Sequence, residues 1–185
     1  FHLAALRGDC DRLRQLLDTG KVHIDSRDRT GTSSLFFAAQ GGFLDIARLL
    51  LEAGAAIDGP STDGGTPLFV ACQCGHLPVV EDLIRRGANV NSCMKDKASP
   101  LFIAAQNGHD DVCRALLAAG ARVDAARSDG ATPLWICAQC GHEHVARTLL
   151  QRGARVDQLR QVPYEPTPNT YTVIRCRPRT QTLHL

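Results

Sequence analysis

The stretch DGATPLWICAQCGHEHVARTLLQRGA (residues 129–154) decides the fold, because it recurs along the chain at a fixed spacing. Steps of 33 residues back from Leu134 and from Gly153 reach the equivalent residues of the earlier copies: Leu101, Leu68 and Leu35, and Gly120, Gly87 and Gly54. A fixed period of this size indicates supersecondary units stacked on one another in place of one globular core.

Each copy carries the signals of two short helices joined by a turn. Thr66-Pro67 and Thr132-Pro133 place a hydroxyl at a helix N-cap and a proline at the first helical position. In each full copy we expect this helix to end at a glycine in the left-handed conformation. The four glycines are Gly42, Gly75, Gly108 and Gly141. Apolar pairs such as Leu149-Leu150 mark one face of a second helix, and polar stretches such as residues 58–65 suit a projecting hairpin.

Thr-Pro-Leu, Ala-Ala, Gly-His and Leu-Leu-x-x-Gly-Ala at these offsets resemble the ankyrin repeat. The resemblance covers residues 1–157 and implies an all-α ankyrin-repeat solenoid of helix-turn-helix units with connecting β-hairpin loops, whose first helices line a concave surface. We expect a partial repeat at 1–26, repeats at 27–58, 59–91, 92–124 and 125–157, and a tail containing Pro and Arg at 158–185. Two interpretations of the partial repeat stay open: a polar end cap, as Arg12 suggests, or the remnant of a longer array. The tail is a linker, a cover for the last repeat, or the place where a longer array was interrupted.

Charge and cysteine usage limit the function classes. The net charge is +2, and the four arginines and one glutamate of residues 158–185 carry +3 of it, which leaves residues 1–157 at −1. A near-neutral array offers little affinity for phosphate backbones, so we expect no nucleic-acid partner. The eight cysteines lack disulfide-framework spacing and indicate reduced thiols in the cytoplasm or nucleus. No run reaches the roughly 18 apolar residues of a membrane span, so we expect none. We also expect the protein to be a monomer.

The candidate partner-binding residues vary from copy to copy or recur along one expected helix row. At the hairpin tips they are Arg29, Thr30, Lys95, Asp96, Lys97, Ser128 and Asp129, and in the groove they are Gln73, Gln106, Asn107, Gln139 and Cys140. The resemblance implies that such positions meet protein partners, although the glutamines could equally be solvated side chains. Lys97 stands where other copies have glycine, so its hairpin is either reshaped or strained.

An aromatic residue follows each Thr-Pro-Leu or its equivalent: Phe36, Phe69, Phe102 and Trp135. The family pattern has histidine there, which only His2 keeps. We expect the rings to pack beneath the hairpins; an exposed aromatic binding stripe is the alternative.

No residue set indicates catalysis or a bound cofactor. Cys137, Cys140 and His142 have a spacing similar to that of zinc ligands, but a structural zinc needs four ligands, so we expect apolar core fillers and no metal. His76, His109 and His142 each follow a helix-ending glycine and are expected to be structural.

The sequence therefore predicts a non-catalytic protein-protein interaction scaffold or adaptor with a protein partner of unknown identity. Two alternatives are the substrate-targeting arm of a larger enzyme such as a ubiquitin ligase, and a structural spacer. Asn91 also resembles ankyrin asparagines that are hydroxylated.

Overall fold

The computed structural model describes residues 1–157, so the predicted tail at 158–185 lies outside the described residues. Residues 1–157 contain ten helices and no strand apart from one isolated bridge between Arg27 and Ser33. The helices are α1 (His2–Arg7), α2 (Cys10–Asp18), α3 (Ser34–Gln40), α4 (Leu44–Glu52), α5 (Pro67–Cys74), α6 (Leu77–Arg85), α7 (Pro100–Asn107), α8 (Asp110–Ala118), α9 (Pro133–Cys140) and α10 (Glu143–Gln151). The predicted all-α solenoid is confirmed.

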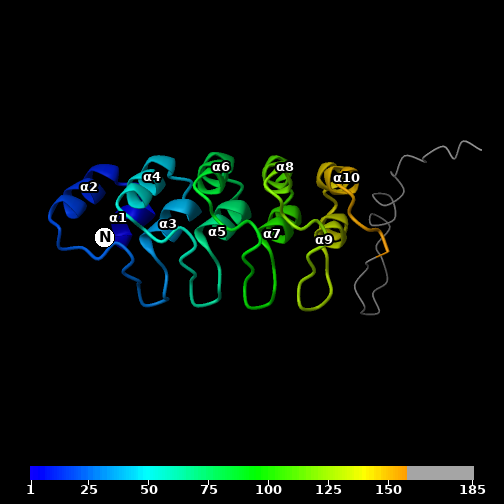
Figure 1. Ribbon diagram of the computed structural model, residues 1–185, viewed down its shortest axis with the longest axis horizontal. Helices are drawn as coiled ribbons and strands as arrows, with labels where there is room; N and C mark the ends of the chain where they lie inside the picture. The colour runs from blue at the N-terminus through cyan, green and yellow to red at the C-terminus, as the bar shows by residue number, and fades with distance from the viewer. Residues whose placement is uncertain (158–185) are drawn as a thin grey trace, which may run out of the picture.

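The helices form two parallel rows (Figure 1). The first helices of the units, α1, α3, α5, α7 and α9, pack on one another in chain order, and the second helices, α2 to α10, do the same. Hairpin loops project side by side from the row of first helices (Figure 1). Within each unit the two helices pack together, and each unit also contacts the units on either side, as expected for a solenoid.

Each first helix after α1 begins at a hydroxyl cap. The side-chain oxygens of Thr66 and Thr132 accept hydrogen bonds from backbone N–H groups three residues later, both at 3.2 Å. Ser33 and Ser99 make the same contact in the other copies, at 3.3 and 3.1 Å. Because each cap satisfies a donor that the helix cannot, it fixes where the helix begins.

Glycines end these helices as the sequence predicts. Gly75, Gly108 and Gly141 are C-caps with φ between 75° and 80°, and Gly42, one residue past the C-cap of α3, has φ 71°. This left-handed conformation suits a residue without a Cβ, and it turns the chain back so that the second helix packs against the first.

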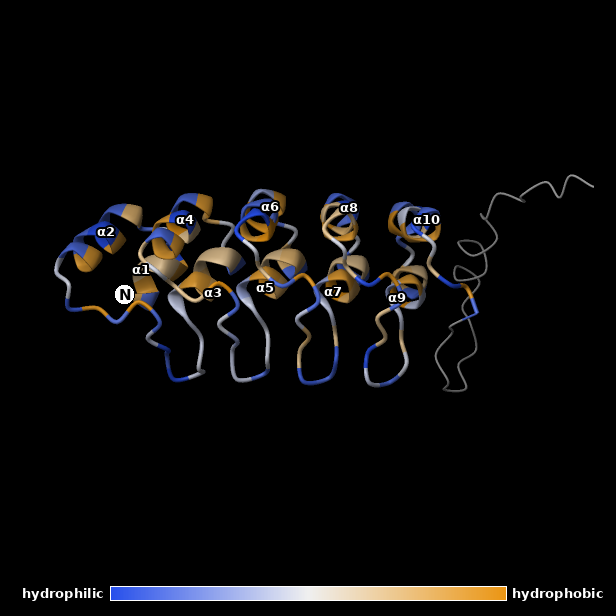
Figure 2. Cartoon of the chain, viewed as in Figure 1, coloured by the Kyte–Doolittle hydropathy of each residue, from blue (hydrophilic) through white to orange (hydrophobic). Residues whose placement is uncertain are grey.

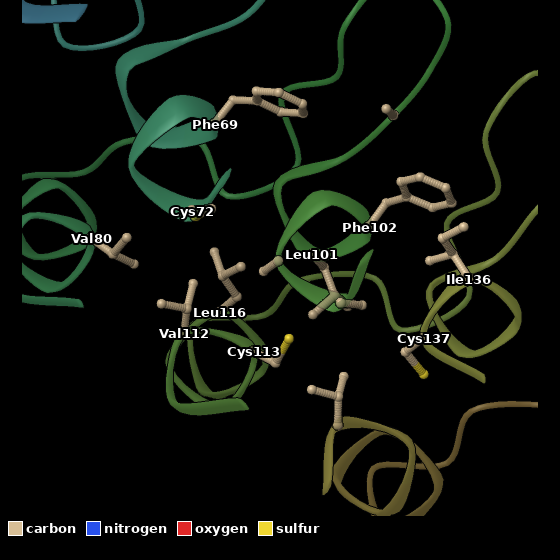
Figure 3. Close-up of a cluster of buried hydrophobic side chains, with 14 of the residues drawn as sticks. Phe69, Cys72, Val80, Leu101, Phe102, Val112, Cys113, Leu116, Ile136 and Cys137 are labelled. Carbon is tan, nitrogen blue, oxygen red and sulfur yellow. The ribbon is translucent and has the colours of Figure 1, made fainter. Parts of the chain in front are cut away.

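The core lies between the two rows. Leu101 of α7 and Val112 and Leu116 of α8 are among its fully buried side chains. In Figure 3 they point into the same space as Cys113. Apolar residues gather on the facing sides of the helices, whereas the hairpin tips are hydrophilic (Figure 2). The helices thus form a packed scaffold from which polar loops project.

Candidate functional site: the hairpin edge and its groove

The four hairpin tips form one hydrogen-bonded edge. Thr62 donates its hydroxyl to the carbonyl of Thr30 at 2.6 Å, which joins the first tip to the second. The N–H of Lys95 donates to the carbonyl of Asp63 at 3.0 Å, and that of Ser128 donates to the carbonyl of Asp96 at 2.8 Å. Since each tip is tied to the next, the edge presents its side chains in a fixed order.

The first tip is organised by Asp28, which sequence reasoning did not single out. Its carboxylate accepts hydrogen bonds from the hydroxyl of Thr30 at 2.7 Å and from the N–H groups of Thr30 and Thr32 at 2.9 Å. These bonds, the Thr30 hydroxyl foremost, lower the pKa of Asp28. Arg29 and Thr30 are both exposed, but the Thr30 hydroxyl serves the turn, which leaves Arg29 as the more accessible contact.

The third tip holds Lys95, Asp96 and Lys97, all exposed. Lys97 has φ 67°, close to the values of Gly31, Gly64 and Gly130 at the same place in the other tips, between 73° and 88°. The hairpin therefore keeps the turn of the other copies with a residue that the left-handed region disfavours. Of the two alternatives that the sequence allowed, the strained turn is confirmed.

The fourth tip is internally paired. Ser128 is exposed, but Asp129 accepts hydrogen bonds from Arg127, from Nε to Oδ1 at 3.0 Å and from Nη2 to Oδ2 at 2.6 Å. This pairing raises the pKa of Arg127. Asp129 thus lies in its predicted place, but its charge is already matched within its own hairpin.

The predicted groove residues recur along the first helices. Gln73, Asn107, Gln139 and Cys140 are exposed and Gln106 is half-buried. Asn107 donates its side-chain amide to the carbonyl of Gln73 at 2.9 Å, so it also ties α7 to α5.

A cavity of about 250 Å³ lies where the hairpins meet the first helices. Of the predicted site residues, Gln73, Asp96 and Gln106 line it, and the remaining nine do not. Phe36, Phe69 and Phe102 also line it. Two of the predicted groove residues, Gln73 and Gln106, therefore line the same cavity as Asp96 of the third tip. The predicted residues of the first tip, Arg29 and Thr30, lie outside it.

The aromatic ladder is packed. Phe69, Phe102 and Trp135 are only 5%, 1% and 6% exposed, and Phe36 is half-buried. Phe69 and Phe102 leave their helices on the side away from Cys113 and Leu116 (Figure 3). The packing prediction is confirmed, and an exposed stripe along all four rings is wrong.

The histidines after the helix-ending glycines are structural. The Nε2 atoms of His76, His109 and His142 lie 3.0 to 3.2 Å from the carbonyls of Gln40, Gln73 and Gln106, each in the preceding unit. Every one of these rings therefore links two neighbouring repeats.

The cysteines of the Cys-x-x-Cys pair lie in different surroundings. Cys137 is fully buried, donates to the carbonyl of Leu134 at 3.2 Å, and has its pKa raised to about 12 by burial. Cys140 is exposed. Within residues 1–157, no group of three or more His, Cys, Asp or Glu side chains is placed to hold a metal ion.

Asp82 in α6 is a buried charge that sequence reasoning missed. It is 3% exposed and accepts hydrogen bonds from Arg48 of the preceding unit at 3.1 Å, from Arg85 at 2.9 Å and from Arg86 at 2.8 Å. Leu49, Ala115 and Thr148 take the equivalent position in other copies. An acidic residue on an otherwise apolar face was the signal available.

Asn91 also bridges two units. Its side-chain oxygen accepts from the N–H of Arg122 at 3.0 Å, and its amide donates to the carbonyl of Gly120 at 3.3 Å. Hydroxylation of Asn91 stays a prediction.

Among the described residues, no helix is long and apolar enough to cross a membrane.

A family model for ankyrin repeats, three copies long, matches residues 1–94 and 83–159. Ankyrin repeat domain-containing protein 29 of Homo sapiens is 46% identical over 54 residues, which are 29% of this chain and 18% of that protein. Osteoclast-stimulating factor 1 of Danio rerio is 42% identical over 52 residues, 28% of this chain and 24% of that protein. Each match thus spans less than a quarter of the relative. Ankyrin repeats are generally protein-protein interaction modules, and this chain, matched over most of its length, belongs to the ankyrin repeat family.

Proposed function

We propose that residues 1–157 act as a non-catalytic, monomeric scaffold or adaptor that binds a protein partner through the hairpin edge and the adjoining groove. The observation that carries the proposal is the chain of hydrogen bonds from tip to tip, through Thr62, Lys95 and Ser128. The thiol-rich composition favours the cytoplasm or nucleus as its location.

A pre-ordered edge favours association for an entropic reason. Binding normally requires loops to lose conformational freedom, roughly 0.5–1.5 kcal/mol for each immobilised side chain with many rotamers. Here the tips are held before any partner arrives, since one hydrogen bond ties each tip to the next, from the Thr62 hydroxyl or from the N–H groups of Lys95 and Ser128. More of the contact free energy then remains for affinity.

The strained turn at Lys97 adds support. A non-glycine residue in the left-handed region costs of order 1–3 kcal/mol, and such residues cluster at functional sites. Lys97 is exposed at a tip and carries a charge that glycine could not supply. We infer that the lysine side chain contacts an acidic surface of the partner.

Affinity capture from cell lysate tests the proposal with the full chain and with the double variant Lys95→Glu, Lys97→Glu. The control is the double variant Arg122→Glu, Arg152→Glu, which changes the net charge equally at exposed positions outside the tips. We expect a protein retained by the wild type and the control to be lost by the tip variant, with all three chains melting at the same temperature.

Two results would contradict this function. Equal capture by all three chains would exclude the third tip as a contact. Capture of nothing above background by the folded wild-type chain would favour a structural spacer.

A further inference from the structure

The fourth hairpin shows how this fold holds a guanidinium group. Arg127 lies over the ring of Phe102, 4.9 Å from its centroid, and forms a two-pronged pair with Asp129. An aromatic face and a carboxylate fork recognise the planar, charged guanidinium together, through cation–π attraction and charge-assisted hydrogen bonds. The arginine covers the ring, and Phe102 is only 1% exposed.

The second hairpin repeats this arrangement without its arginine. Arg127 and Asp129 stand 25 and 27 residues after Phe102, and the same offsets from Phe36 reach Ser61 and Asp63. The aromatic ring and the carboxylate are both present, but a small hydroxyl replaces the guanidinium. In the third hairpin, the corresponding residue is Met94, an apolar side chain packed against the core.

The space left by the missing side chain is open. Phe36, Ser61 and Asp63 line the cavity of about 250 Å³. Gly65 borders it too, where the next two hairpins have alanine, and a Cβ there would lie 3.3 Å from the Ser61 hydroxyl and 3.6 Å from the Phe36 ring. In contrast to Phe102, Phe36 is only half-buried.

The charge around this cavity is negative. Asp63 and Asp96 line it and are exposed, and the one arginine in its wall, Arg127, is paired with Asp129. Arg27, on the neighbouring hairpin, donates to the carbonyls of Gly31 and Pro60. The carbonyls hold the Arg27 side chain but do not neutralise its charge. Among the described residues, two carboxylates, Asp63 and Asp96, thus face one basic group without an acidic partner, so a cation would enter a site of net negative charge.

We infer that Phe36 and Asp63 form a binding site for an arginine side chain of the partner protein, which would take the place that Arg127 takes in the fourth hairpin. This inference rests on the proposed protein-binding function. Arginine fits better than lysine, because only a planar guanidinium pairs with both carboxylate oxygens while lying flat on a ring. A cation–π contact at an exposed site is modest, so the arginine is one anchor within a longer bound segment.

Supplying the arginine from the chain itself tests the site without a known partner. We expect Ser61→Arg to raise the melting temperature by roughly 2–4 °C over Ser61→Met, which fills the space without charge as Met94 does. The gain should shrink when Asp63→Asn is added to both variants, because only the contact with the Phe36 ring then remains. If Ser61→Arg melts no higher than Ser61→Met, or if Asp63→Asn leaves the gain undiminished, Phe36 and Asp63 do not hold a guanidinium together and the inference is overturned.

A titration with N-acetyl-arginine amide, followed by backbone NMR, tests access from solution. We expect saturable shifts at Phe36 and residues 61–65 in the wild type that are lost in Asp63→Asn and in Ser61→Arg. N-acetyl-lysine amide should bind at least threefold more weakly, and the uncharged citrulline amide should cause no shifts there. No shifts with the arginine amide, or equal shifts with citrulline, would overturn the inference.

The two proposals can fail separately. If Ser61→Arg captures the partner as well as the wild type does while Lys95→Glu, Lys97→Glu loses it, protein binding stands and the arginine site falls. Loss of the partner in both variants supports both proposals.

Discussion

Replacing Asp82 with asparagine isolates the charge that joins two neighbouring repeats. The substitution keeps the volume and one acceptor oxygen, so packing in α6 is preserved while the ion pairs to Arg48, Arg85 and Arg86 are removed. Glu81→Gln is the matched control, because it neutralises an exposed carboxylate one position earlier on the same helix.

The expected loss of unfolding free energy is roughly 1–2 kcal/mol. Hydrogen bonds to a charged group contribute about 1.5–3 kcal/mol and exposed helix pairs about 0.3–0.5, while desolvation of the buried carboxylate opposes both. The loss stays below the roughly 3–5 kcal/mol for breaking a fully buried pair. The reason is that the arginine side chains are 34–66% exposed and regain water when the carboxylate is gone. The melting temperature should fall by roughly 2–8 °C.

The pH dependence separates charge from packing. Burial, the largest single influence, raises the pKa of Asp82, but hydrogen bonds from Arg86 and Arg48 and their charges together outweigh it and lower the pKa overall. A lowered folded-state pKa means that the stabilisation is complete above the unfolded value of about 3.9 and is lost as pH falls through the folded value.

Urea titrations followed by circular dichroism, from about pH 7 down to about pH 3, measure this difference. We expect the gap between wild type and Asp82→Asn to narrow at the acid end, whereas Glu81→Gln should follow the wild type at about pH 7. A gap that is constant across this range, or a loss at about pH 7 no larger than that of Glu81→Gln, would refute an ionic role for Asp82.

Three further predictions concern the turn, the caps and the thiols. Lys97→Gly should stabilise the fold by roughly 0.5–1 kcal/mol in urea titrations, because relief of about 1–2 kcal/mol of strain at φ 67° is partly offset by the entropy that glycine adds to the unfolded chain. Gly130→Ala, at φ 82°, should destabilise the fold, and the same sign for both substitutions would be inconsistent with strain. Thr132→Ala should cost about 1 kcal/mol through loss of the α9 cap, measured by urea unfolding followed by Trp135 fluorescence, whereas Thr132→Ser should retain most of the stability. Mass-spectrometric mapping after alkylation near neutral pH should find Cys140 modified well before Cys137, whose burial raises its pKa to about 12; equal rates in the folded chain would contradict that burial.

The fold could be predicted because its determinants are local and repeated. A cap such as Thr132 and a glycine such as Gly141 act within a few residues of their positions, and the 33-residue period confirms each signal in several copies. The histidines were assigned correctly for the same reason, although their partners lie 36 residues earlier. The boundaries of the repeats as domains stay predictions.

The site was less predictable because its contacts join different copies. The tip-to-tip bond between Ser128 and Asp96 involves backbone groups that carry no sequence signal. Pairing between Arg127 and Asp129 could have been noticed from their spacing, but the ring of Phe102 beneath them lies 25 residues away. Two of the arginines bound to Asp82 could have been identified, because Arg85 and Arg86 follow it by three and four residues on one helix. The third, Arg48, comes from the preceding unit and has no such local signal.

At some positions one copy has a residue that differs from its equivalents in the other copies, as Ser61 does. Such positions are candidate binding sites for an energetic reason. In a repeat array each unit contacts only its neighbours, so a substitution at the edge affects one or two interfaces and leaves the remaining stability intact. With serine at position 61, the second hairpin lacks the cation–π contact that Arg127 makes in the fourth, worth about 0.5–1 kcal/mol at an exposed site. It also lacks the ion pair, worth roughly 0–1 kcal/mol near the surface, yet Phe36 and Asp63 remain in place. The scaffold tolerates this small decrease in stability. Because no arginine of the hairpin covers them, the Asp63 carboxylate and the half-buried Phe36 ring can both bind a guanidinium group from another protein.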